Sequence, residues 1–248
     1  MANPLEQFEV DRIAPIAVGG VDASFTNASL FMLVALLLIW GFFLLATRRA
    51  AIVPGRAQAA LEGLVGFVRN MSDEIIGPGG RPFLPLVFTL FLFILVMNVV
   101  GLVPGSFTPT SHIAVTATLA GFIFVLTIAL GLARHGAHFL GLFVPPNTPW
   151  YLLILVVPIE IISFLSRPIT HAVRLFANMT AGHILLKVFA GFVVSLGLAG
   201  GALSVLFPVP LLMTVAFYAL ELLVAVVQAY VFALLTCIYL NDSINLSH

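Results

Sequence analysis

Ionisable side chains recur along one face of an otherwise apolar stretch between positions 160 and 178. Glu160 and Arg167 precede Arg174 by fourteen and seven residues, and seven residues are close to two helical turns. At about 100° of rotation per residue, the polar side chains occupy a sector of about 100°. We therefore predict one polar stripe on a long helix. Its members are Glu160, Ser163, Arg167, Thr170, His171, Arg174 and Asn178.

Arg174 is the residue whose position demands an explanation, because apolar runs flank it on both sides. An arginine at the centre of a membrane costs about 3 kcal/mol on insertion scales, and it keeps its charge at physiological pH. It either pairs structurally with a carboxylate of this chain or faces an acid on another subunit. We favour the second interpretation. Counting residues from the predicted hairpin turn makes Glu221 the nearest carboxylate of this chain, but it places Glu221 at the depth of His183.

That counting uses a second polar seam in the last apolar tract. If the two long tracts fold as an antiparallel hairpin at residues 197–201, equal distances from the turn place Arg174 level with Gln228 and His183 level with Glu221. Glu160 then lies level with residues 241–242, toward the opposite end. The seam comprises Thr214, Tyr218, Glu221 and Gln228.

Two offset groups of ionisable residues, with a fixed cation between them, suit proton transfer across a membrane. A proton carrier that moves through lipid must be a neutral carboxylic acid, and a nearby Arg174 stabilises its anion and expels the proton. One proton crossing 100 mV is worth about 2.3 kcal/mol. The permanent charge also blocks a proton from hopping directly between the two groups.

The composition excludes a soluble fold. Hydrophobic residues make up 61% of the chain and charged residues 8%, whereas a soluble domain carries roughly 25% charged residues. The apolar runs are continuous, which favours membrane helices over an outer-membrane barrel. Ten basic and ten acidic residues cancel, so nothing indicates nucleic-acid binding. The single Cys237 excludes an intrachain disulfide, and the N-terminus does not resemble a signal or transit peptide.

We predict an all-α, polytopic integral membrane protein with about five membrane helices, one interfacial amphipathic helix and a long tilted C-terminal helical hairpin. The chain is expected to form a single membrane domain, 1–248. Its parts are an outer-side N-terminal segment (1–28), a first span (29–47), an interfacial helix (55–77), the second and third spans (85–133) and a proton-channel hairpin (150–240).

Two features set the expected orientation and geometry. Arg48, Arg49 and Arg56 follow the first span, so the positive-inside rule places this loop in the cytoplasm and the N-terminus outside. The tract 150–196 would be roughly 70 Å long as one helix, more than twice the hydrocarbon thickness of about 30 Å. We expect it to be broken, strongly tilted or curved, with Pro158 and Pro168 as places to bend.

These motifs resemble one family, subunit a of the F-type ATP synthase. The resemblance rests on "RLFANMTAGH" (174–183), on Glu160 and Arg167 upstream of it, on Glu221 and Gln228 in the last helix, and on "NVVGLVP" (98–104) at the end of the second span. It extends from the first span to the C-terminus.

The resemblance implies a non-catalytic, proton-conducting stator subunit with two half-channels, no cofactor, and ATP chemistry in other subunits. Arg174 would face carboxylates on a rotating ring of c subunits, supported by Asn178 and Gln228. His183 and Glu221 would line the inlet, with the acid and histidine exchanged relative to many bacterial members, as in the mitochondrial branch. The outlet residues would be Glu160, Ser163 and Thr170, and the proton-translocation set also includes Arg167.

The implied partners are the c ring, the peripheral-stalk b subunits, the rest of the synthase, membrane lipid and protons. The expected location is the bacterial inner membrane, multi-pass with a cytoplasmic C-terminus, or alternatively the mitochondrial inner membrane. An ion-coupled secondary transporter is the alternative function, although no matched broken helices are apparent. A di-metal oxidase would need better-spaced histidines than His135 and His138, and a structural anchor leaves Arg174 unexplained.

Overall fold

The computed structural model describes residues 9–15, 17–18, 21–22, 24–48, 50–103, 105–144, 149–200 and 206–245. Several predicted features lie outside these residues. They are the first eight residues of the N-terminal segment, Arg49, Pro104, and the hairpin residues from Gly201 to the start of the last tract at Ala202.

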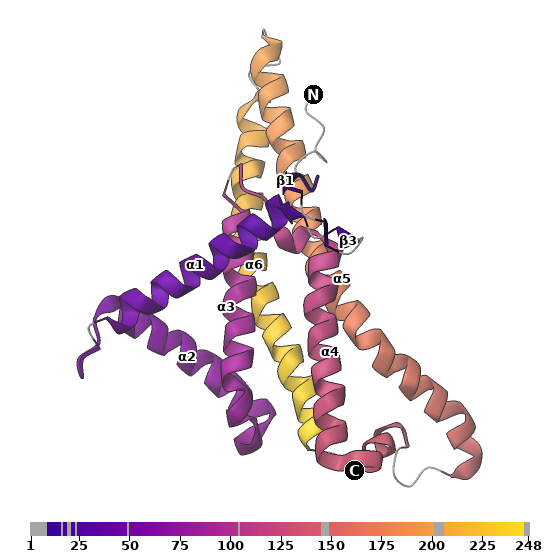
Figure 1. The fold of residues 1–248 in the computed structure, drawn as a ribbon. Helices are drawn as coiled ribbons and strands as arrows, with labels where there is room; N and C mark the ends of the chain where they lie inside the picture. The colour runs from indigo at the N-terminus through magenta and orange to yellow at the C-terminus, as the bar shows by residue number, and fades with distance from the viewer. Residues whose placement is uncertain are drawn as a thin grey trace. The chain divides into compact units, whose positions relative to one another are not determined.

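Most of the described chain is helical (Figure 1). Helices α1 and α2 are followed by a 3-10 turn, η2, which leads directly into α3; η3 precedes α4, and η4 follows it. The bounds are α1 Asn27–Thr47, α2 Arg56–Ile75, η2 Gly77–Phe83, α3 Leu84–Gly101, η3 Pro109–Ser111, α4 Ile113–His135, η4 Gly136–Phe143, α5 Trp150–Ala199 and α6 Pro208–Ile244.

Five of the described helical segments are long and apolar enough to cross a membrane: α1, η2 with α3, α4, α5 and α6. Because lipid offers the backbone no hydrogen-bond partners, a helix that satisfies its own backbone is the favoured way to span it. α2 differs because charged residues such as Glu62, Arg69 and Asp73 are interspersed with its apolar ones. The expected fold class, an all-α polytopic membrane protein, is confirmed.

The N-terminal segment adds structure that the sequence did not predict. Short strands form two antiparallel pairs, and the Oδ1 atom of Asn27 accepts the backbone N–H of Ala28 at 2.8 Å where α1 begins. The pairs are β1 (Arg12–Ala14) with β4 (Phe25–Thr26), and β2 (Ala17–Val18) with β3 (Val21–Asp22).

The first long tract is not broken. α5 runs for 50 residues through both Pro158 and Pro168. Each proline lacks the N–H that would bond the carbonyl four residues earlier. Membrane helices tolerate this loss because nearby groups can satisfy the freed carbonyl. Of the three expected alternatives, the continuous helix excludes a break, whereas a strong tilt or a curvature at the prolines stays a prediction.

The chain divides into two compact units that share α1, α3, α5 and α6. The first unit comprises Met1–Gly41, Phe93–His112 and Leu175–Ala229; the second comprises Phe42–Leu92, Ile113–Arg174 and Tyr230–His248. The grouping of the whole chain into one membrane domain stays a prediction.

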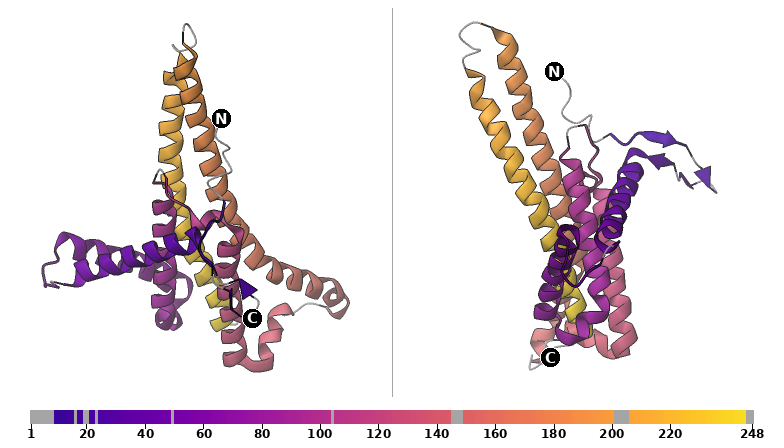
Figure 2. Two further views of the ribbon diagram at one scale, coloured as in Figure 1. Left: turned by 45° about the horizontal axis from the view of Figure 1, so that its top comes forward. Right: turned by 90° about the vertical axis from the view of Figure 1, so that its left-hand side faces the viewer.

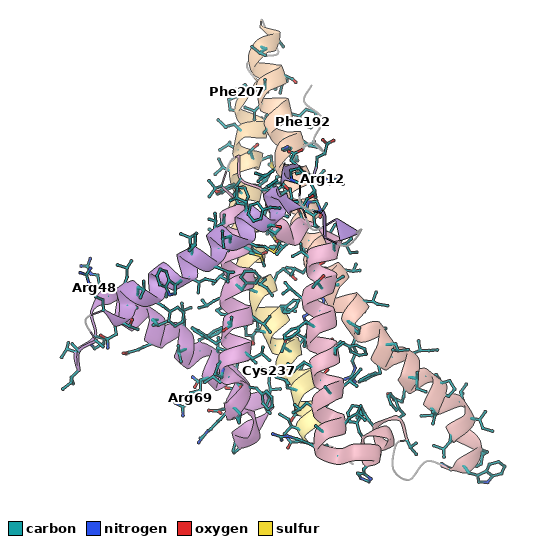
Figure 3. All side chains as sticks on the ribbon, viewed as in Figure 1. Arg12, Arg48, Arg69, Phe192, Phe207 and Cys237 are labelled. Atoms are coloured by element: carbon teal, nitrogen blue, oxygen red, sulfur yellow. The ribbon has the colours of Figure 1, made fainter. Side chains whose placement is uncertain are left out.

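In the first unit, the segments of α5 and α6 run side by side (Figures 1 and 2). Phe189 on α5 and Phe217 on α6 place their ring centroids 4.9 Å apart. Farther along, a Cβ at Gly197 would lie 3.7 Å from the ring of Phe207, which Figure 3 labels. Met179 on α5 and Ala225 on α6 are fully buried in this unit.

In the second unit, α2 packs through Phe67. Its ring lies 5.9 Å from that of Phe91 on α3 and 5.6 Å from that of Tyr230 on α6. The C-terminal end of α6 is held by Asn245, whose Nδ2 donates to the carbonyl of Ile76 at 3.2 Å. Cys237 lies fully buried on α6, whereas Arg69 lies on the polar side of α2 (Figure 3).

Candidate functional site

His183 and Glu221 form a buried pair in the first unit. The Nδ1 atom of His183 on α5 lies 3.6 Å from Oε1 of Glu221 on α6, and the two side chains are 10% and 3% exposed. Within the described parts of the chain, neither Glu221 oxygen has a hydrogen-bond partner. The predicted equal depth of these two residues in the hairpin is confirmed. A carboxyl group this buried is stable when neutral, or when a proton is shared with its neighbour.

Gly182 makes room for the carboxyl group of Glu221. A Cβ built on Gly182 would lie 2.7 Å from Oε1 and 3.1 Å from Cγ of that side chain. Real side chains do not approach a Cβ that closely, so the glycine lets Glu221 lie directly against the backbone of α5. The His183–Glu221 contact therefore depends on a glycine, which has no side chain, at position 182.

Thr108 contacts the other side of the His183 ring. Its Oγ1 lies 2.9 Å from Nε2 of His183 and donates to the carbonyl of Gly101 at 3.3 Å. A Cβ on Gly101 would overlap the Thr108 side chain, so this glycine leaves space for Thr108. The imidazole thus lies between a hydroxyl group and a carboxyl group.

The segment that carries Thr108 is tied to the helices by further hydrogen bonds. Nδ2 of the fully buried Asn98 donates to the carbonyl of Ala225 at 3.1 Å, and Oδ1 of Asn98 accepts from Thr110 at 2.8 Å. Thr180 on α5 donates to the carbonyl of Ser111 at 3.3 Å. Asn98 therefore acts as a cross-link between α3 and α6.

A second polar cluster lies in the second unit, around Arg167. Its Nη1 is 2.6 Å from Oδ2 of Asp242, and each of the two side chains is 29% exposed. The guanidinium group also lies over two aromatic rings, 5.4 Å from the Phe164 centroid and 5.5 Å from the Tyr239 centroid. Counting had placed Asp242 level with Glu160; the ion pair in the structure is with Arg167.

His171 lies close to this cluster and is 3% exposed. Its ring centroid is 3.8 Å from that of Phe232 and 5.7 Å from that of Tyr239. Neither ring nitrogen has a hydrogen-bond partner in the described ranges. His171 therefore packs as an aromatic residue on the stripe.

The remaining predicted site residues are placed individually. Arg174 and Asn178 are exposed on α5, and Gln228 on α6 is buried. Arg174 belongs to the second unit, whereas Asn178 and Gln228 belong to the first. The predicted equal depth of Arg174 and Gln228 stays a prediction. Of the residues predicted for the outlet, Glu160 is partly exposed and Ser163 and Thr170 are exposed.

The residues of these clusters that were absent from the predicted site include Gly101, Thr108, Gly182 and Asp242. The run "FTPTSH" (107–112), with three hydroxyl groups between two long apolar segments, was the available signal for Thr108. Nothing in the local sequence points to the two glycines, because their role lies in what the neighbouring helix or loop places opposite them. No group of three or more His, Cys, Asp or Glu side chains able to hold a metal ion occurs in the described parts of the chain.

Comparison with known proteins gives consistent matches. A model of the family described as "ATP synthase A chain" matches residues 29–241. The chain is 56% identical over 244 residues to "ATP synthase subunit a" of Rhizobium etli (strain CIAT 652), covering 98% of this chain and 97% of that protein. It is 53% identical over 248 residues to the protein of that name from Allorhizobium ampelinum, with the same coverage of 98% and 97%. The corresponding protein of Pelagibacter ubique is 50% identical over 247 residues, with 99% of each chain covered.

Proposed function

Because the chain belongs to the ATP synthase A chain family, we propose that it is the proton-translocating membrane subunit of an F-type ATP synthase. It provides an inlet and an outlet half-channel to carboxylates on a ring of c subunits, and Arg174 separates the two. The subunit itself performs no ATP chemistry. The observation that supports this most directly is the buried His183–Glu221 pair, a site able to hold a transferable proton inside an apolar helical hairpin.

The inlet consists of His183 and Glu221. A proton arriving from the outer side is held by this pair and passes to a ring carboxylate, which becomes neutral and can enter lipid. After the ring has turned, the carboxyl group approaches Arg174 from the other direction. The guanidinium group stabilises the anion, and the proton leaves toward the cytoplasm.

The outlet follows the stripe on α5. Glu160, Ser163 and Thr170 provide a carboxylate and two hydroxyl groups for water and proton passage, and Arg167 lies on the same face. Asn178 and Gln228 support Arg174 through their amide groups. Because arginine does not lose its proton, Arg174 cannot itself relay one and acts as the barrier between the two paths.

The proposed surroundings follow from the family. The c ring faces the exposed side of α5 that carries Arg174, and the peripheral-stalk b subunits and the remaining synthase subunits complete the assembly. The relatives named above come from bacteria, which supports the bacterial inner membrane as the location. The N-terminus lies outside and the C-terminus in the cytoplasm.

The test is ATP-driven proton pumping in membrane vesicles that carry Arg174→Ala, with Arg174→Lys alongside. We expect Arg174→Ala to lower coupled pumping by at least about 100-fold, since a preorganised charge is lost. Arg174→Lys keeps a positive charge but loses the planar fork and can deprotonate, so it should restore little. Copurification of the ATPase subunits checks assembly.

Arg134→Ala is the matched control, because Arg134 lies in the last turn of α4 and over the ring of Phe83, 5.8 Å from its centroid. It should pump at the wild-type rate. Near-normal pumping by an assembled Arg174→Ala complex would show that the arginine is only structural. If no ATPase copurifies with the wild-type chain, the ion-coupled transporter becomes the leading function.

A further inference from the structure

We propose that Tyr218 is a positioning residue of the inlet. Its hydroxyl group and the amide group of Asn98 hold α6 at one register on α3, and this register sets the depth of Glu221. The inference rests on the proposed function, in which Glu221 and His183 form the inlet. Tyr218 belongs to the polar seam of α6 but has no part in the proposed proton relay, and it moves no proton itself.

Two side-chain hydrogen bonds join α3 and α6 in opposite directions. Asn98 on α3 donates through Nδ2 to the carbonyl of Ala225 on α6 at 3.1 Å. Tyr218 on α6 donates through its hydroxyl group to the carbonyl of Leu102, directly after α3, at 3.2 Å. Both acceptors are backbone atoms, so each bond sets the position of the main chain and not only that of a side chain.

Glu221 lies between the two bonds on α6. Tyr218, Glu221 and Ala225 are spaced by three and four residues, so they share one face of the helix. The bonded residues on α6 are separated by two helical turns, a rise of about 10 Å. A single bond would let α6 pivot about it, whereas two bonds at different heights resist both sliding and rotation. The carboxyl group between them is therefore held at one level of α3.

That level of α3 is also where the loop after α3 contacts the inlet histidine. Along the two bonds, residue numbers fall on α6 as they rise on α3, so the helices are antiparallel here and Glu221 lies level with the last turn of α3. The carbonyl of Gly101 in that turn accepts from Thr108, whose Oγ1 lies 2.9 Å from Nε2 of His183. A slip of α6 by one residue, about 1.5 Å, would change the separation of 3.6 Å between Glu221 and His183.

The two bonds differ in how deeply their donors are buried. Asn98 is fully buried, and its Oδ1 atom also accepts from Thr110 at 2.8 Å, so replacing it would disturb the interior. Tyr218 is 40% exposed. The Leu102 carbonyl follows the end of α3, where carbonyl groups lack an intrahelical donor and depend on donors from outside the helix. The hydroxyl group of Tyr218 is therefore the bond that can be removed with the smaller disturbance.

The experiment measures ATP-driven proton pumping in vesicles that contain the whole synthase, with Tyr218→Phe and Tyr218→para-aminophenylalanine. Phenylalanine keeps the ring and lacks the donor, whereas the amino group donates to the Leu102 carbonyl from nearly the same place. We expect Tyr218→Phe to lower pumping by about threefold to tenfold, the effect of losing one hydrogen bond that aligns a reacting group. The amino variant should pump within about twofold of wild type.

The carboxyl group of Glu221 gives a readout that a purely structural role of Tyr218 would not change. Infrared difference spectroscopy of the synthase follows its C=O stretching band, which is assigned by its loss in Glu221→Gln. A carboxyl group that is no longer held at one level samples several surroundings, so Tyr218→Phe should shift and broaden this band. The amino variant should return the band to its wild-type position.

Tyr151→Phe is the matched control, because it removes the same hydroxyl group from a tyrosine that is 60% exposed near the start of α5. It should pump at the wild-type rate and leave the Glu221 band unchanged. If Tyr218→Phe does not assemble, para-methylphenylalanine takes its place in the comparison, since it fills the space of the hydroxyl group without a donor.

An unchanged Glu221 band in an assembled Tyr218→Phe complex overturns the inference, and so does pumping at the wild-type rate. An amino variant that pumps no better than Tyr218→Phe also overturns it, because the donor then has no role. Arg174→Ala and Glu221→Gln are measured in the same vesicles. If they abolish pumping while Tyr218→Phe does not change it, only the inference about Tyr218 fails. If they pump normally, the proposed function fails.

Discussion

The two polar clusters accommodate ionisable side chains in an apolar protein in different ways. In the first unit, Glu221 is almost fully buried, and its polar neighbour is a histidine, which is a titratable group. In the second unit, Asp242 is 29% exposed and is paired at 2.6 Å with Arg167, which keeps its charge. The first cluster can change its net charge by one proton, whereas the second holds a fixed ion pair.

This difference indicates which of the two carboxyl groups can take part in proton transfer. A buried carboxyl group beside a titratable base responds to proton concentration, since neither charge state is strongly favoured by a permanent partner. A carboxyl group paired with an arginine has no titratable base beside it, so this pair contributes mainly to the local structure. An ionisable residue in a membrane is a functional candidate by default, and the character of its partner separates the two cases.

The largest expected effect comes from neutralising each acid. Glu221→Gln should lower ATP-driven proton pumping by at least about 100-fold, because the amide cannot release a proton on this timescale. Asp242→Asn is the matched change in the other cluster and should leave pumping within about twofold of wild type. Pumping in assembled vesicles is the measurement. Equal losses of pumping from Glu221→Gln and Asp242→Asn would contradict the proposed difference between the two clusters.

An intermediate effect is expected from Gly182→Ala. The new Cβ would lie 2.7 Å from Oε1 of Glu221, so the carboxyl group must move away from His183. We expect pumping to fall between about tenfold and 100-fold, as for a misplaced reacting group. Gly191→Ala is the control, because that glycine lies on the same helix with nothing within 4 Å of a Cβ. Similar losses in both variants would assign the effect to helix propensity instead.

The smallest effect is expected from the Arg167–Asp242 ion pair. A double-mutant cycle with Arg167→Gln and Asp242→Asn should give a coupling free energy of unfolding below about 1 kcal/mol, because water partly screens both groups. Thermal unfolding of the purified complex in detergent measures it. A coupling free energy of several kcal/mol would mean that Arg167 and Asp242 depend on each other as strongly as His183 and Glu221 do.

The sequence predicted the helices and one contact of the site. The predicted first span 29–47 and the second and third spans within 85–133 are apolar enough to cross a membrane, and the structure has helices at these places. The His183–Glu221 contact followed from counting outward from the hairpin turn, which works because both residues lie on regular helices with a constant rise. Where spacing alone determines position, the sequence was sufficient.

Counting could not locate the partners that depend on side-chain reach or on irregular backbone. Thr108 lies between α3 and η3, where no periodic rise relates residue number to depth. Arg167 reaches Asp242 with a long side chain, so the partner is not the residue at its own level. The sequence also could not decide between a broken and a continuous α5 at Pro158 and Pro168, because the cost of a proline in a helix depends on its surroundings.

Gly182 and Glu221 occupy what is in effect one shared volume. A larger side chain at position 182 needs a shorter one at position 221, since a Cβ there already meets the glutamate carboxyl group. The two positions are therefore expected to vary together, and a harmful enlargement on α5 should be rescued by Glu221→Asp on α6, which shortens the side chain and keeps the carboxyl group. Suppressor selection starting from Gly182→Ala would identify such compensating pairs, which neither position could reveal by itself.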